Sequence, residues 1–193
     1  SSDLLVEIAI PGQCKIPEAT FYAAMIWLRA LRRSPERADA ATLLEKLAKV
    51  EEKLKLWASL CPDNFEAKYL LVQAERSRMR GEFAEATELY RRATAAARAA
   101  KYVNLEALAN ERHGEFWLEH KQDRIAEVFL ADAAHLYRSW GALGKLAQLQ
   151  HCSLWFHLAS FVVDNEYIFL CSYLTTNSNP FAVAHWTALR AAV

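Results

Sequence analysis

The chain has 193 residues, which suits a single domain or one run of stacked repeats. Hydrophobic residues make up 53% of it, enough for a substantial core, so the chain is not a disordered tail. Its 23 basic and 23 acidic residues cancel, so the composition favours neither nucleic acid nor an anionic membrane as a partner, and we expect neither.

The N-terminal segment and the cysteines predict a cytoplasmic setting. SSDLLVEIAIPG has no basic region before its apolar residues, unlike a secretory signal, and it lacks an initiating Met, which indicates a piece of a longer protein. The cysteines at 14, 61, 152 and 171 form no CxxC motif and no Cys/His cluster. We therefore expect reduced thiols rather than disulfides or zinc ligands.

Prolines are scarce, and their positions predict long helices. They stand at 11, 17, 35, 62 and 180, so residues 63 to 179 contain none. A β protein of this size normally needs more turn residues. Ala, Leu, Glu, Lys and Arg, which favour helices, fill the intervals. We predict an all-α chain, with at most a short strand near residues 6 to 10.

Two amphipathic helices are predicted first. IPEATFYAAMIWLRALRR begins with Pro17, which the first helical position accepts. Its apolar residues share one face: Phe21, Met25, Leu28 and Leu31. The second helix, DAATLLEKLAKVEEKLKLWASL, also carries its apolar residues at helical spacing: Leu43, Leu47, Val50, Leu54 and Trp57.

Turn and capping residues divide the next part of the chain into four helices. CPDNFEAKYL ends the second helix and starts a third, which Asp63 caps while Glu66 completes a capping box. Gly81 separates this helix from one that runs to about residue 100. Two more, at about 103 to 119 and 123 to 139, precede Gly141.

Small residues recur after forty positions, which predicts repeated helix pairs. Four residues of one pair align with four of the next: Ala74, Ala86, Tyr90 and Ala93 with Gly114, Ala126, Leu130 and Ala133. Such residues occur where two helices approach closely, as in tetratricopeptide repeats, although the usual repeat of that type is shorter than this one. We predict a tetratricopeptide-like antiparallel helix-pair solenoid over residues 1 to 150. The alternative is two unrelated pairs in an ordinary bundle.

Residues 151 to 193 form a segment with few charges, only Asp164, Glu166 and Arg190. An open solenoid end must be covered, so we expect an apolar C-terminal helical cap packed on the last repeat. A patch for a partner, including a homodimer through this segment, and sequence foreign to the repeat are the alternatives.

No pattern in the chain predicts catalysis, a cofactor or a metal. GALGK, residues 141 to 145, lacks the spacing of a phosphate loop and is interpreted as a helix stop. GxSxG and HExxH are absent, and no two histidines have i, i+4 spacing. Glu111, Glu115 and Glu119 do have that spacing and form an acidic stripe, which is either solvated or meets a basic partner.

Three stretches resemble a known family: LKLWASLCPDNFEAKYLLVQAERSRMRG, EALANE and YRSWGALGKLAQL. They are similar to the helical-repeat region of large multidomain signalling kinases that contain AAA-type ATPase, GAF and histidine-kinase modules. The resemblance covers about residues 17 to 150. It implies a relay or scaffold whose partners are neighbouring kinase, ATPase or sensor modules, and it carries no catalytic residues onto this chain.

These patterns predict a non-catalytic protein-binding or signal-relay scaffold, whose partner is a neighbouring module or a peptide. Solenoids bind on an extended concave surface, which the first helix of each pair lines. The predicted partner-binding residues are Lys68, Leu71, Glu75, Arg78, Leu108, Glu111, Glu115 and Leu118. A helical ligand-sensing domain with an apolar pocket near the aromatic C-terminal part is the alternative, and a helical enzyme ranks third.

Overall fold

The computed structural model describes residues 15 to 149, and every regular element in this range is a helix. Six helices have defined bounds: α2 (Lys15–Arg33), α3 (Ala40–Leu60), α4 (Pro62–Arg80), α5 (Phe83–Ala99), α6 (Val103–Glu119) and α7 (Asp123–Trp140). Another helical stretch begins at Leu143. The all-helical prediction is thereby confirmed, while the predicted strand at 6 to 10 and the segment 151 to 193 lie outside the described residues.

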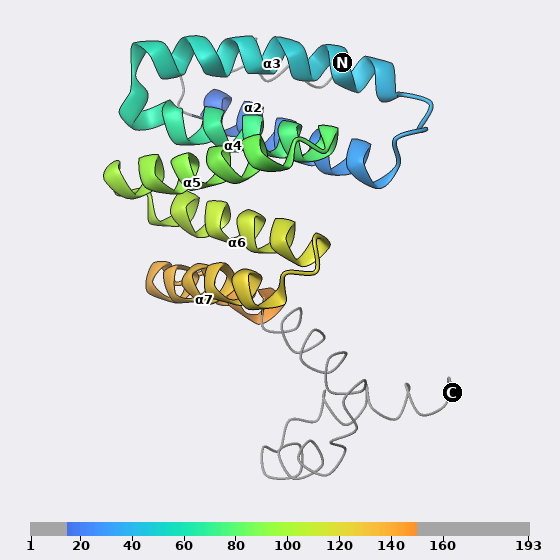
Figure 1. The fold of residues 1–193 in the computed structure, drawn as a ribbon. Coiled ribbons are helices and arrows are strands. Elements are labelled where there is room, and N and C mark those ends of the chain that lie inside the picture. The colour runs from blue at the N-terminus through green and yellow to red at the C-terminus, as the bar shows by residue number, and fades with distance from the viewer. Residues whose placement is uncertain (1–14, 150–193) are drawn as a thin grey trace, which may run out of the picture. The chain divides into compact units, whose positions relative to one another are not determined.

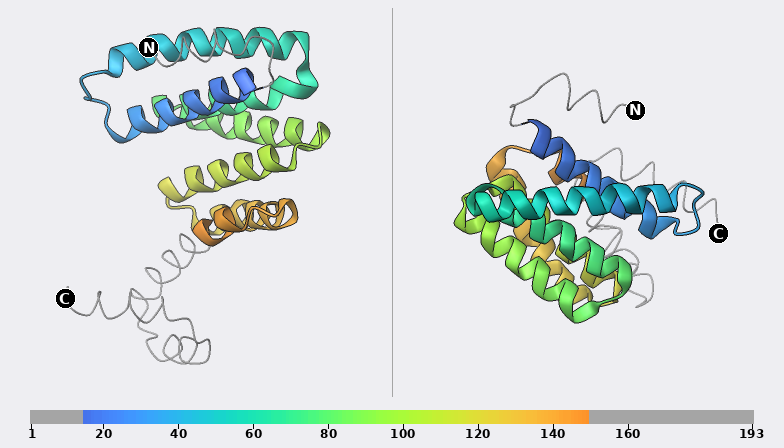
Figure 2. Two further views of the ribbon diagram at one scale, coloured as in Figure 1. Left: turned by 180° about the vertical axis from the view of Figure 1, so that it is seen from behind. Right: turned by 90° about the horizontal axis from the view of Figure 1, so that it is seen from above.

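The chain divides into two compact units, Ser1–Leu146 and Ala147–Val193, and all six helices belong to the first. Within this unit each helix packs against the next one along the chain, and successive helices run in opposite directions (Figure 1). Helix α2 packs on α4 as well as on α3, as the views in Figure 2 also show. No helix among the described residues is both long and apolar enough to span a bilayer.

Four helices end in the same kind of turn, and these turns are evenly spaced along the chain. Gly81, Lys101, Lys121 and Gly141 all have left-handed backbones, with φ of 76°, 59°, 57° and 83°. In each turn the following amide donates to a carbonyl five residues back: Glu82 to Ser77, Tyr102 to Ala97, Gln122 to Trp117 and Ala142 to Tyr137, at 2.9 to 3.0 Å. These are Schellman motifs. Two intervals between turns make up the forty-residue period of the sequence.

The small residues of that period lie where helices meet. Ala86 and Ala126 are fully buried. Gly114 of α6 lies so close to α7 that an added Cβ would be 2.7 Å from Leu130 Cγ and 3.2 Å from the Ala126 carbonyl oxygen. The prediction that small side chains mark close helix contacts is confirmed at these positions.

The predicted N-cap of α4, Asp63, is wrong by two residues. The helix begins at Pro62, its N-cap is Cys61, and no side chain caps it. Asp63 lies in the first turn rather than before it, because the fixed φ of proline suits the first helical position. Gly141, by contrast, ends α7, as predicted for GALGK, and its backbone is left-handed.

Candidate partner-binding face

The eight predicted partner-binding residues lie on α4 and α6, and most of them are buried. We call the surface that they share the α4–α6 face. Leu71 and Glu75 are at most 1% exposed, Lys68, Arg78 and Glu111 are also buried, and Leu108, Glu115 and Leu118 are half-buried. Five of the eight are therefore not exposed on this face in the structure. Their role in partner binding stays a prediction.

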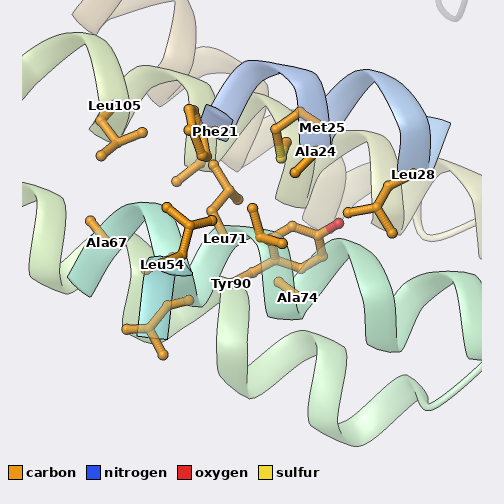
Figure 3. Packing of buried hydrophobic residues seen from close by; sticks show 14 of the residues in the cluster. Phe21, Ala24, Met25, Leu28, Leu54, Ala67, Leu71, Ala74, Tyr90 and Leu105 are labelled. Carbon is orange, nitrogen blue, oxygen red and sulfur yellow. The ribbon is translucent and has the colours of Figure 1, made fainter. Parts of the chain in front are cut away.

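Helix α2 contributes to this burial, because its apolar stripe packs into the same core as Leu71 of the α4–α6 face. Phe21, Met25 and Leu28 are buried in one cluster with Leu71 of α4 and Leu105 of α6. In Figure 3, Phe21 lies close to Leu71 and Leu105, whereas Leu28 lies closer to the hydroxyl end of Tyr90. The sequence predicted this stripe, but it did not indicate which surface the stripe covers.

Two ion pairs fix the ends of α2. Near its first turn, Glu18 Oε1 lies 2.8 Å from Lys68 Nζ of α4. Near its last turn, Arg32 pairs with Glu119 at the end of α6. Because the paired residues lie at matching ends of their helices, α2 runs parallel to α4 and α6.

Glu75 is the centre of a buried polar network. Its Oε1 accepts hydrogen bonds from Tyr90 Oη at 2.8 Å, Arg112 Nε at 3.1 Å and Arg78 Nη1 at 3.2 Å. Burial disfavours the charged carboxylate, but the guanidinium groups of Arg112 and Arg78 outweigh it and hold the pKa of Glu75 below its ordinary value. The carboxylate is thus a buried anion that links α4, α5 and α6.

The two arginines extend this network along α6. Arg78 Nε donates to Glu119 Oε2 at 2.9 Å, and its Nη1 donates to the backbone carbonyl of Arg112 at 3.2 Å. Arg112 Nη1 in turn donates to Glu115 Oε2 at 2.6 Å. Two residues of the predicted acidic stripe, Glu115 and Glu119, therefore neutralise arginines of the chain itself.

The third residue of the stripe, Glu111, joins α6 to the end of α7. Its Oε2 accepts from Tyr137 Oη at 2.6 Å, and its Oε1 accepts from Lys145 Nζ at 2.6 Å. Burial and the Glu111 charge raise the pKa of Tyr137, so the phenol stays protonated and remains a donor. Each carboxylate of the predicted acidic stripe therefore has a partner within the chain, and Glu119 is also exposed to solvent.

Several buried polar atoms, some near α2 and some between α5, α6 and α7, have no hydrogen-bond partner among the described residues. They are Arg32 Nε, Glu75 Oε2, Arg78 Nη2, both ring nitrogens of His113, and Trp117 Nε1. Buried polar groups without partners are uncommon in folded proteins, because each forfeits its hydration. The apolar side chains of α2 are thus buried in the core, but polar atoms of Arg32, Glu75 and Arg78 lack hydrogen-bond partners.

His113 is a packing residue between α5, α6 and α7. Its ring stacks on Tyr90 with centroids 5.1 Å apart and lies 4.0 Å from the Phe129 centroid. Burial, with the nearby Arg78 charge, lowers its pKa from 6.5 to about 4, so the ring is neutral at pH 7. Within residues 15 to 149, no three His, Cys, Asp or Glu side chains are grouped to hold a metal.

One surface hollow, of about 340 Å³, lies between α3 and α4. Charged side chains dominate its lining, including Glu51, Glu52, Arg76 and Arg80. Glu51 and Arg76 form an ion pair with each other. The lining of this hollow is charged, whereas the ligand-sensing alternative predicts an apolar pocket. That pocket was expected near the C-terminal part of the chain, which lies outside the described residues.

Sequence comparison connects this helical chain with signalling proteins. No family model matches it, and no solved structure matches it. A stretch of 50 residues is 40% identical to the hybrid signal transduction histidine kinase G of Dictyostelium discoideum. The match covers 26% of this chain and 2% of that kinase, so the chain spans only a small fraction of its relative.

Proposed function

We propose that this chain is a non-catalytic, protein-binding segment of a larger cytoplasmic signalling protein, where it relays contact between neighbouring kinase, ATPase or sensor modules. The observation that carries the proposal is the way the α4–α6 face binds α2. An amphipathic helix is held there by an apolar stripe and an ion pair near each end. Helix-in-groove recognition between proteins uses the same arrangement.

The repeated turns support a tetratricopeptide-like solenoid as the framework of this function. Left-handed turns at 81, 101, 121 and 141 give each helix pair the same length and reverse the chain at equal intervals. Stacked pairs of this kind present extended surfaces, on which partner proteins dock. The similarity to a hybrid histidine kinase supports a signalling role for such a surface.

The charged groups of the α4–α6 face support binding rather than catalysis. Glu75 and Glu111 each accept a tyrosine hydroxyl and a cationic side chain, so both carboxylates are held by partners within the chain. A general acid or base must lie within hydrogen-bond reach of a substrate proton. We therefore propose that these carboxylates fix the geometry of the helices.

A binding titration tests the proposal. The full chain is titrated by calorimetry with a purified histidine-kinase module of a hybrid signalling kinase, and we expect saturable binding. Leu118→Glu changes a half-buried residue of the α4–α6 face and should weaken binding. The matched control, Glu85→Arg, changes an exposed residue of α5 and should not. Equal affinities for both variants, or no binding by the unmodified chain, would contradict the proposal.

A further inference from the structure

We propose that α2 is a displaceable occupant of the α4–α6 face. The partner that replaces it is an amphipathic helix with large apolar residues at positions i, i+4 and i+7, and an uncharged carboxamide side chain at i+11. This inference rests on the protein-binding function proposed above and specifies how the binding surface is regulated. In the structure, those four positions of α2 are Phe21, Met25, Leu28 and Arg32.

Helix α2 meets the α4–α6 face much as a bound helix would. Phe21, Met25 and Leu28 are buried in a core that α2 shares with α3, α4 and α6, whereas Ile26 on the opposite side of the helix is 65% exposed. Anchors of this spacing on one side of a helix are the pattern by which grooves recognise helical partners. A partner with the same stripe can therefore occupy the same surface.

The connection of α2 to the rest of the chain also differs from the other connections. Residues 34 to 39 join α2 to α3, whereas one to three residues join each later pair of described helices. None of these six residues has a left-handed backbone. In the structure these residues form turns. When the turns open, this tether of six extended residues can span about 20 Å, which allows α2 to leave the face while α3 stays in place.

The polar contacts under α2 indicate that a different helix can fit better. Arg32 lies beside Arg78 and Arg112, and burial together with these like charges lowers the pKa of Arg32. Arg32 Nε and Arg78 Nη2 are buried without hydrogen-bond partners. A carboxamide at this position can donate to Glu119 and accept from Arg78, and it adds no third cation. A helix with a carboxamide at this position should therefore bind the α4–α6 face more tightly than α2 does.

Hydrogen exchange on the unmodified full chain gives the first test. If α2 opens separately from the rest of the unit, its amides should exchange at least about tenfold faster than those of α4. Equal protection of α2 and α4 means that α2 leaves only when the whole unit unfolds, and it overturns the displacement. This measurement needs no substitution and does not depend on the histidine-kinase titration, whose failure would contradict the proposed function instead.

A peptide gives the second test. The probe is a labelled peptide of residues 15 to 33 that carries Arg32→Gln, and its matched control also carries Leu28→Asp. The tether holds α2 at a high effective concentration, so a full chain with Leu28→Glu should bind the probe at least about tenfold more tightly than the unmodified chain. On binding, the α2 amides of the unmodified chain should lose protection while those of α6 keep theirs. A probe that binds no better than the control peptide overturns the proposal.

Discussion

Tyr90 donates a hydrogen bond to Glu75 across 2.8 Å, and both side chains are almost completely buried. The bond joins α5 to α4 inside the buried polar network that also lies close to Arg32 of α2. Replacing Tyr90 by Phe keeps the ring but leaves a buried carboxylate with one donor fewer. We expect the free energy of unfolding to fall by about 1–3 kcal/mol, measured by urea denaturation.

Tyr69→Phe is the matched control for this change. Tyr69 lies on the same helix as Glu75 but is half-buried beside the charged hollow between α3 and α4. Removing its hydroxyl should change the free energy of unfolding by no more than about 0.5 kcal/mol. Similar losses in the two variants would mean that the Glu75 network does not stabilise the fold.

Stability should decrease as the pH falls below 6.5, because His113 is buried as the neutral ring. Its pKa is about 4 in the folded chain and near the ordinary 6.5 in the unfolded chain, so the unfolded chain binds the proton first. The stabilisation is therefore complete above pH 6.5 and is lost as the pH falls towards 4. Between pH 7 and pH 5 we expect the free energy of unfolding to drop by about 2 kcal/mol from this residue.

Denaturation of two histidine variants at both pH values checks this assignment. His113→Phe keeps an aromatic ring in place and should remove most of the drop. His135→Gln changes an exposed residue of α7 and should leave the drop unchanged. A drop of the same size in His113→Phe as in the unmodified chain would assign the pH dependence to other groups.

The left-handed turns should respond oppositely to two substitutions. Gly81 has φ of 76° with nothing within 4 Å of an added Cβ, so Gly81→Ala should cost about 1–2 kcal/mol through backbone strain alone. Lys121 has φ of 57° and carries the strain already. Lys121→Gly should therefore raise the free energy of unfolding by about 0.5–1 kcal/mol. Chemical denaturation measures both changes, and a loss of stability in Lys121→Gly would contradict this account.

A larger side chain at Ala126 should force α7 away from α6. Ala126 is fully buried, and its carbonyl faces Gly114 across the closest helix contact described above. Ala126→Leu should destabilise the fold by about 1–3 kcal/mol and clearly lower the melting temperature. Glu127→Leu places the same side chain on an exposed neighbouring position and should not. Equal melting temperatures for the two variants would argue against this helix contact.

Local signals in the sequence were enough to predict the helices and the forty-residue period. Apolar spacing marked α2 and α3, and Gly81 and Gly141 marked two of the turns. The predicted helix bounds at about 100, 103, 119 and 123 also located the turns at Lys101 and Lys121, but not their left-handed backbone, because lysine occupies a conformation that glycine favours. The forty-residue repetition is the signal that could have revealed that conformation, because Lys101 and Lys121 are each forty residues from a glycine turn.

Burial of the α4–α6 face was harder to predict, because charged residues usually lie at the surface. Glu75 and Arg78 are buried only because each finds partners on other helices, and such pairing depends on tertiary contacts. One local signal was present. The run Leu70–Leu71–Val72 puts apolar side chains around most of a helical turn, and all three are buried. A helix that is apolar on several sides is covered on several sides.

The equal spacing of the left-handed turns also limits how the chain can change in length. An insertion as long as one interval between turns adds one helix and one turn. Every later helix then runs in the opposite direction and no longer packs against its original partner. An insertion as long as two intervals, such as a second copy of the segment from 103 to 142, restores the original direction and lets each remaining helix keep its partner. Length variation among relatives of this unit should therefore occur in whole helix pairs.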